Sequence, residues 1–128
     1  KARPPAGPIP PVLMSRFDVH SHSDGDGFLL EVQATILSRL NTRVVVPLMT
    51  QAGAPKPMVR LNPVFEVVGR PVVMMTHYIA AIPIKLLPDP VGDLTARRDG
   101  IVDALDFLQQ GFWPPPRVRL GRLRRTGA

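Results

Sequence analysis

The sequence predicts a small, mainly β domain that ends in one α-helix. Short runs of apolar and β-branched residues recur between turn-forming residues from residue 17 to residue 87, and they account for five or six strands. An apolar stripe with helical spacing follows them. A chain of 128 residues has room for a single modest core. Short strands with tight turns in so small a domain indicate a barrel or a strongly curved sheet.

The first two strands are predicted to form a hairpin. Residues 17–20 alternate between apolar and polar side chains, and residues 28–32 are apolar with one charge. Residues 21–27 between them are rich in Ser, Asp and Gly, which favour turns. This pattern predicts two antiparallel strands joined by a loop of several residues.

Three further segments complete the predicted sheet. Residues 43–48 form a β-branched run that is typical of a buried strand, and we expect Pro47 to end it. A loop is predicted over residues 50–57. Residues 64–68 and 72–76 flank a turn at residues 69–71, which predicts a second hairpin. A last apolar stretch, residues 79–87, is broken by Pro83.

The final predicted element is an amphipathic helix. Its apolar residues recur at spacings of three, four, seven and eleven, which places them on one face of a helix. Gly111 is a natural end for that helix. The apolar residues are Ile101, Ala104, Leu105, Leu108 and Phe112.

Composition excludes several classes of protein. The absence of cysteine excludes disulfides and Cys-ligated metal sites. No apolar run approaches the ~20 residues needed to span a bilayer. Residues 1–13 contain five prolines and lack the continuous apolar segment of a secretory signal.

The positive charge is concentrated at the two ends of the chain. Seven of the 16 basic residues lie in those ends, so residues 14–113 hold nine basic and all 10 acidic residues. A body that is electrically near neutral argues against a groove for nucleic-acid phosphates. The seven are Lys1, Arg3, Arg117, Arg119, Arg122, Arg124 and Arg125.

The same ends differ from the body in proline content. We expect residues 1–13 to be a disordered, proline-rich leader, either an over-extended start or a partner-binding arm. Residues 114–128 are expected to form a disordered basic tail rich in Pro and Arg. The domain itself is then residues 14–113.

The residues alone single out no reaction chemistry. No phosphate-binding glycine loop, zinc-ligand spacing or nucleophile elbow is present. On a strand, His20, His22 and Asp24 would share a face and resemble a metal cluster, but no third spaced ligand is obvious. A polar hairpin loop whose Asp-Gly pairs supply the turn is the simpler interpretation, and we expect no metal site. His77 is expected to be a packing or surface histidine. A ribonuclease would recruit His77 with Arg43 and Arg70 around a phosphate, although their spacing does not point to one.

Three segments resemble the CcdB toxin family. They are residues 43–48 (RVVVPL), residues 61–69 followed by residues 74–83, and the helix positions Ile101, Ala104 and Leu105 with Gly111-Phe112. Their order and gaps agree with that family from Phe17 to Phe112. The resemblance implies a small SH3-like barrel of the CcdB/Kid type, with a short additional sheet and one C-terminal helix, that works as a homodimer.

The resemblance also implies a function. CcdB proteins are toxins of type II toxin–antitoxin modules that bind the A subunit of DNA gyrase and trap the gyrase–DNA cleavage complex. A CcdA-like antitoxin neutralises them. Such a toxin selects one state of its target and performs no bond chemistry. The resemblance therefore implies a cytoplasmic protein that is no enzyme, needs no cofactor or metal, and neither reads a nucleic-acid sequence nor binds a membrane.

The family's gyrase contact comes from the last residues of the helix, Trp-Gly-Ile in the best-known form. Gln110, Gly111 and Phe112 align with them, so the aromatic ring is missing at Gln110. Because a buried tryptophan is a typical hot spot, this departure bears on function. Trp113 is either a replacement after a small shift or a loose tail residue.

Other family contacts carry over with open alternatives. Ile36 and Leu37 align with an apolar pair that supports the gyrase surface, and ordinary core packing is the alternative. Asp106 and Gln109 occupy polar helix positions near the same end, where a solvated face is the alternative. The loop at residues 21–27 lies where family members meet the antitoxin, although its sequence does not match.

Two other functions remain open at this point. One is an endoribonuclease toxin of the Kid/MazF type, which would need phosphate-facing cations on the body. The other is an inactive CcdB relative that keeps the fold and the antitoxin. Gln110 and the long basic tail favour this second alternative.

Overall fold

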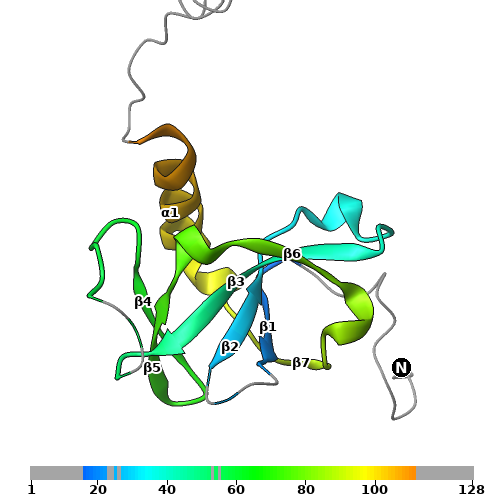
Figure 1. Cartoon of the computed structure of the whole chain (residues 1–128), viewed down its shortest axis with the longest axis horizontal. Helices are drawn as coiled ribbons and strands as arrows, with labels where there is room; N and C mark the ends of the chain where they lie inside the picture. Colours follow the sequence, from blue (N-terminus) through cyan, green and yellow to red (C-terminus); the bar gives the residue numbers. More distant parts are fainter. Residues whose placement is uncertain (1–15, 23–24, 26, 53, 55, 112–128) are drawn as a thin grey trace, which may run out of the picture.

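A computed structural model describes residues 16–22, 25, 27–52, 54 and 56–111 of the chain (Figure 1). The expected leader and basic tail, and with them Phe112 and Trp113, lie outside the described residues. The strands are β1 (Asp18–Ser21), β2 (Phe28–Glu31), β3 (Thr42–Thr50), β4 (Val64–Val67), β5 (Arg70–Met74), β6 (Ala80–Pro83) and β7 (Pro90–Asp93). The helix α1 spans Arg98–Gln110, and the 3₁₀ turns are η2 (Thr35–Leu37), η3 (Thr76–Tyr78), η4 (Ile84–Leu86) and η5 (Thr95–Arg97).

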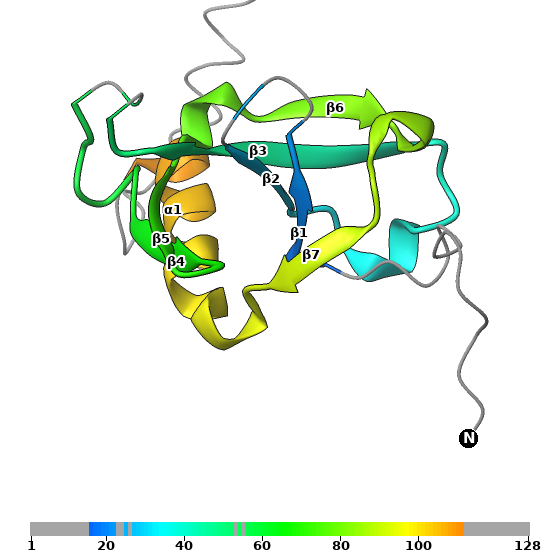
Figure 2. The same ribbon diagram turned by 90° about the horizontal axis from the view of Figure 1, so that it is seen from below.

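The described strands form one antiparallel sheet in the order β4-β5-β3-β2-β1-β7. The strand β3 is the longest and pairs on one edge with two others, β6 along its first half and β5 along its last residues. The sheet curves strongly, and α1 packs against its concave side (Figures 1 and 2). A mainly β, barrel-like fold with one C-terminal helix was the prediction, and it is confirmed.

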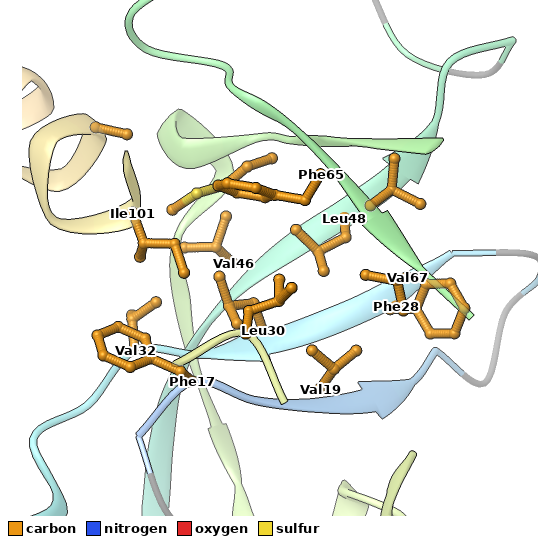
Figure 3. Close-up of a cluster of buried hydrophobic side chains, with 14 residues drawn as sticks. Phe17, Val19, Phe28, Leu30, Val32, Val46, Leu48, Phe65, Val67 and Ile101 are labelled. Atoms are coloured by element: carbon orange, nitrogen blue, oxygen red, sulfur yellow. The ribbon is translucent and has the colours of Figure 1, made fainter. Parts of the chain in front are cut away.

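The core lies between the curved sheet and α1. Figure 3 shows its apolar side chains converging from β1, β2, β3, β4 and the helix. From α1 it receives Ile101 and Ala104, both fully buried, while Val102 and Leu105 pack at its margin. The predicted apolar helix face is therefore the face that packs on the sheet. Burying one such aliphatic side chain contributes about 1.5–3 kcal/mol.

Both predicted hairpins are present, but the turn of the second begins one residue earlier than expected. Register pairs Val67 with Arg70, so the turn consists of Val68 and Gly69 rather than residues 69–71. Both turn residues have a positive φ, 52° and 77°. A two-residue turn of this kind matches the twist of the strands that it joins.

The expectation that Pro47 ends its strand is wrong. β3 continues through Pro47 to Thr50, and Pro47 pairs with Leu29 of β2. An amide hydrogen at residue 47 would point away from β2, to the edge of β3 that pairs with β6 and β5. It would lie in the gap between those two ladders, so its absence breaks no ladder hydrogen bond. The carbonyl of Pro47 in that gap accepts a hydrogen bond from the Met75 amide at 2.9 Å.

Candidate functional site

A short turn after β2 exposes three large apolar side chains. Ile36 is 89% exposed, Leu37 46% and Leu40 50%. We call these three residues the η2 surface. Core packing, the alternative for Ile36 and Leu37, is therefore wrong. Exposed apolar groups gathered on one segment are a feature of protein-binding sites.

The local backbone explains this exposure. Within the turn, the amides of Leu37, Ser38 and Leu40 donate to the carbonyls of Ala34, Thr35 and Leu37 at 2.9, 2.9 and 3.1 Å. These bonds within the turn satisfy three of its backbone amides without any packing of its side chains. No residue of η2 is buried.

The end of α1 carries the other predicted contact residues. Gln109, Gln110 and Gly111 are exposed, and Asp106 is half-buried. Gly111 ends the helix with φ 97°, and its amide donates to the Phe107 carbonyl at 2.9 Å. This is the conformation for which glycine is favoured. Phe112, the third aligned residue, lies outside the described residues.

An ion pair links α1 to the loop before β4 at the surface. Arg60 donates from Nε and Nη2 to the two carboxylate oxygens of Asp103 at 3.1 and 3.0 Å, and its guanidinium lies 5.2 Å from the Phe107 ring centre. The hydrogen bond to Asp103 raises the pKa of Arg60 above its ordinary value. Bidentate geometry of this kind sets an orientation more firmly than a single contact does.

The two predicted contact regions do not lie together in one chain. In both views η2 lies near the start of β3, whereas the end of α1 lies on the other side of the domain (Figures 1 and 2), near the loop that precedes β4. A single copy therefore presents two separate surfaces rather than one continuous site.

The structure also contains a buried polar network that the sequence did not reveal. His20, Glu31 and Arg43 come from β1, β2 and β3 and are 0%, 2% and 1% exposed. Glu31 accepts from Arg43 Nε at 3.0 Å and lies 3.2 Å from His20 Nε2. The only sequence signal was a charge inside or beside each apolar run.

This network bears on two alternatives that the sequence raised. His20 is bonded inside the domain to Glu31 and the Pro88 carbonyl, and among the described residues no three His, Asp or Glu side chains could hold a metal ion. Asp24 lies outside the described residues. Arg43 is buried against Glu31, so it is not the phosphate-facing cation that a ribonuclease would use.

The surroundings of His20 favour its charged form. Burial by itself lowers the pKa of His20, but the hydrogen bonds to Glu31 and to the Pro88 carbonyl, with the charges of Glu31 and Asp18, outweigh it and raise the pKa above 6.5. The geometry agrees, because Nδ1 lies 2.7 Å from the Pro88 oxygen and Nε2 faces a carboxylate. Two acceptors require a proton on each ring nitrogen.

An open groove lies beside the loop between β1 and β2. Its lining includes His22, Gly27, Pro47 and Tyr78, and an adjoining apolar cavity of about 280 Å³ shares three of these residues. Gly27 is required there, since a Cβ atom would lie 2.7 Å from the Leu48 carbonyl oxygen. His77 is exposed and its ring lies 4.5 Å from that of Tyr78, as expected for a surface histidine.

Comparison with known proteins identifies a family. The sequence model of the family described as CcdB protein matches residues 16–111, which include β1 to β7 and all of α1. A search of curated proteins finds no match. Among the described residues, no helix is long and apolar enough to cross a membrane.

Proposed function

The chain belongs to the CcdB family, and we propose on that basis that it is a toxin that binds the A subunit of DNA gyrase and traps the gyrase–DNA cleavage complex. In this mechanism the toxin binds one conformational state of gyrase and raises its population. No bond is made or broken by the toxin, so the proposal needs no catalytic residue. The protein would act in the cytoplasm, where gyrase meets DNA.

The observation that supports this proposal is the exposure of the η2 surface. Ile36 and Leu37 align with an apolar pair that family members use towards gyrase, and here they project from the domain with no core role. The end of α1, with Asp106, Gln109, Gln110 and Gly111, supplies the second contact region of the proposal. A homodimer would present two copies of each region to a two-fold target.

The groove beside the β1–β2 loop is the proposed place for a CcdA-like antitoxin. Its lining is mainly apolar, with His22 and Thr50 as polar side chains at the groove, and such a lining suits a peptide segment that carries apolar side chains. Arg43 is buried in an ion pair and so is not available to face a phosphate, which counts against the ribonuclease alternative.

A surface substitution tests the proposed contact. Ile36→Asp places a charge in the middle of the η2 surface, and we expect the affinity for purified gyrase A subunit to fall at least ~30-fold because a hot-spot contact of about 2 kcal/mol is lost. Calorimetric titration measures it. The free energy of unfolding should change by less than about 0.5 kcal/mol, because Ile36 is exposed.

The matched control is Val68→Asp, which adds the same charge at another exposed apolar residue, in the β4–β5 turn. It should bind gyrase A like the parent protein. Equal binding by Ile36→Asp and the parent protein would remove the η2 surface from the proposed interface. Cleavage of RNA by the purified protein would favour the ribonuclease.

A further inference from the structure

The η2 surface has little packing of its own. No side chain of Thr35–Leu37 is buried, and Leu37 and Leu40 are each about half exposed. A segment that buries so little apolar surface opens easily unless other interactions restrain it. Its position therefore depends largely on hydrogen bonds to the body of the domain.

Arg43 supplies three of these hydrogen bonds. Its Nη2 donates to the Ser38 carbonyl at 2.5 Å, and its Nη1 donates to the carbonyls of Leu40 and Thr42, each at 3.0 Å. These carbonyls lie along the segment that leads from η2 into β3. A guanidinium carries five donors in one fixed plane, so a single buried side chain restrains several carbonyls at once.

Glu31 orients that guanidinium. Its Oε2 accepts from Arg43 Nε at 3.0 Å, while its Oε1 faces His20 Nε2 at 3.2 Å. Buried ion pairs are often no more stable than apolar residues of the same volume. The distinctive contribution of this pair is the direction that it gives to the remaining Arg43 donors.

Gln33 restrains the same segment from a second point. Its Nε2 donates to the Leu37 carbonyl at 3.0 Å, and its Oε1 accepts from the Val44 amide at 3.1 Å. The side chain is buried and so links the last residue of η2 directly to β3. At the other end of η2, the Arg16 amide donates to Thr35 Oγ1 at 3.1 Å.

We propose that Arg43 and Gln33 are positioning residues for the η2 surface, and that Glu31 acts by orienting Arg43. This inference rests on the proposed role of the η2 surface in binding gyrase. Neither residue touches the partner. Each keeps the three exposed apolar side chains in one arrangement, so that binding does not have to order them first.

Two substitutions in the full-length chain test this inference. Arg43→Lys keeps a positive charge beside Glu31 but loses the planar set of donors. Gln33→Met keeps the volume and removes both hydrogen bonds. The control is Val67→Ala, which removes core contacts in β4, away from η2, and so lowers stability by another route.

Two measurements are made at a temperature at which all variants are folded. Backbone amide order parameters of residues 35–40 should fall from about 0.85 towards 0.6 in Arg43→Lys and in Gln33→Met, and stay near the parent value in Val67→Ala. Affinity for purified gyrase A subunit should fall roughly tenfold in the first two and not in the control.

The two measurements distinguish the positioning role of Arg43 and Gln33 from the proposed binding of gyrase. Order parameters in both variants that equal those of Val67→Ala overturn the positioning role, whatever the affinity. If the parent protein does not bind gyrase A, the proposed function fails, and the order parameters still decide whether Arg43 and Gln33 hold η2. If Arg43→Lys does not fold, Gln33→Met decides alone.

Discussion

Val68 is a β-branched residue in a turn that calls for a positive φ. Its φ is 52°, its side chain is exposed, and Gly69 follows it at φ 77°. Asparagine adopts this conformation far more readily, and Asn-Gly is a preferred sequence for such two-residue turns. We expect Val68→Asn to raise the free energy of unfolding by about 1 kcal/mol, measured by urea denaturation. An unchanged or lower value would show that the turn is not strained at Val68.

His20 makes stability depend on pH in a defined direction. Its pKa is 6.5 when unfolded and higher in the folded domain, so its contribution is complete below pH 6.5 and is lost as the pH rises through the raised value. The urea concentration at the midpoint of denaturation should therefore decrease as the pH is raised from about 6 to about 8.

A pair of variants identifies the histidine responsible. His20→Gln should flatten this decline, whereas His77→Gln, at an exposed histidine, should keep it. A decline that persists unchanged in His20→Gln would assign it to another group.

At the level of elements, α1 is buried against the core along its first turns and exposed at its end. Ile101 and Ala104 are buried in the core, and Asp103 accepts hydrogen bonds from Arg60. These contacts hold the helix that positions Gln110 at its exposed end. If Gln110 aligns with the family tryptophan, Gln110→Trp should increase affinity for gyrase A by tenfold or more, since an aromatic anchor contributes about 2 kcal/mol. Calorimetry measures this.

The control is Arg98→Trp, which adds the same ring at the exposed opposite end of α1 and should leave affinity unchanged. Weaker or equal binding by Gln110→Trp would mean that the end of α1 contacts the target differently in this chain.

Which elements could be predicted follows from local chemistry. The hairpin strands and α1 carry strong periodicity, and turn residues bound them. The strand β7 has the sequence Pro-Val-Gly-Asp, three of whose four residue types are depleted in strands, and it forms because β1 offers an edge to pair with. Pro47 likewise fits inside β3 only because two different strands share one edge there.

The candidate site was less accessible from the sequence, for a physical reason. An apolar pair such as Ile36-Leu37 is indistinguishable in sequence from core residues, and only the resemblance to CcdB proteins pointed to it. The network of His20, Glu31 and Arg43 depends on strand register, which brings together residues 11 and 12 positions apart. Periodicity describes faces of single elements and does not supply such contacts.

At the scale of the whole molecule, a curved sheet with α1 packed on its concave side leaves the η2 surface and the end of α1 exposed on different sides of the domain, and we propose that both contact gyrase. The proposed function requires the protein to trap gyrase on cleaved DNA. Incubating the full-length protein with purified gyrase from a host sensitive to this family, supercoiled plasmid and ATP, and then denaturing the enzyme, tests this requirement. We expect linear DNA to accumulate with the parent protein and with Val68→Asp but not with Ile36→Asp. If the parent protein yields no linear DNA under conditions in which a known gyrase poison does, the protein does not trap gyrase on cleaved DNA.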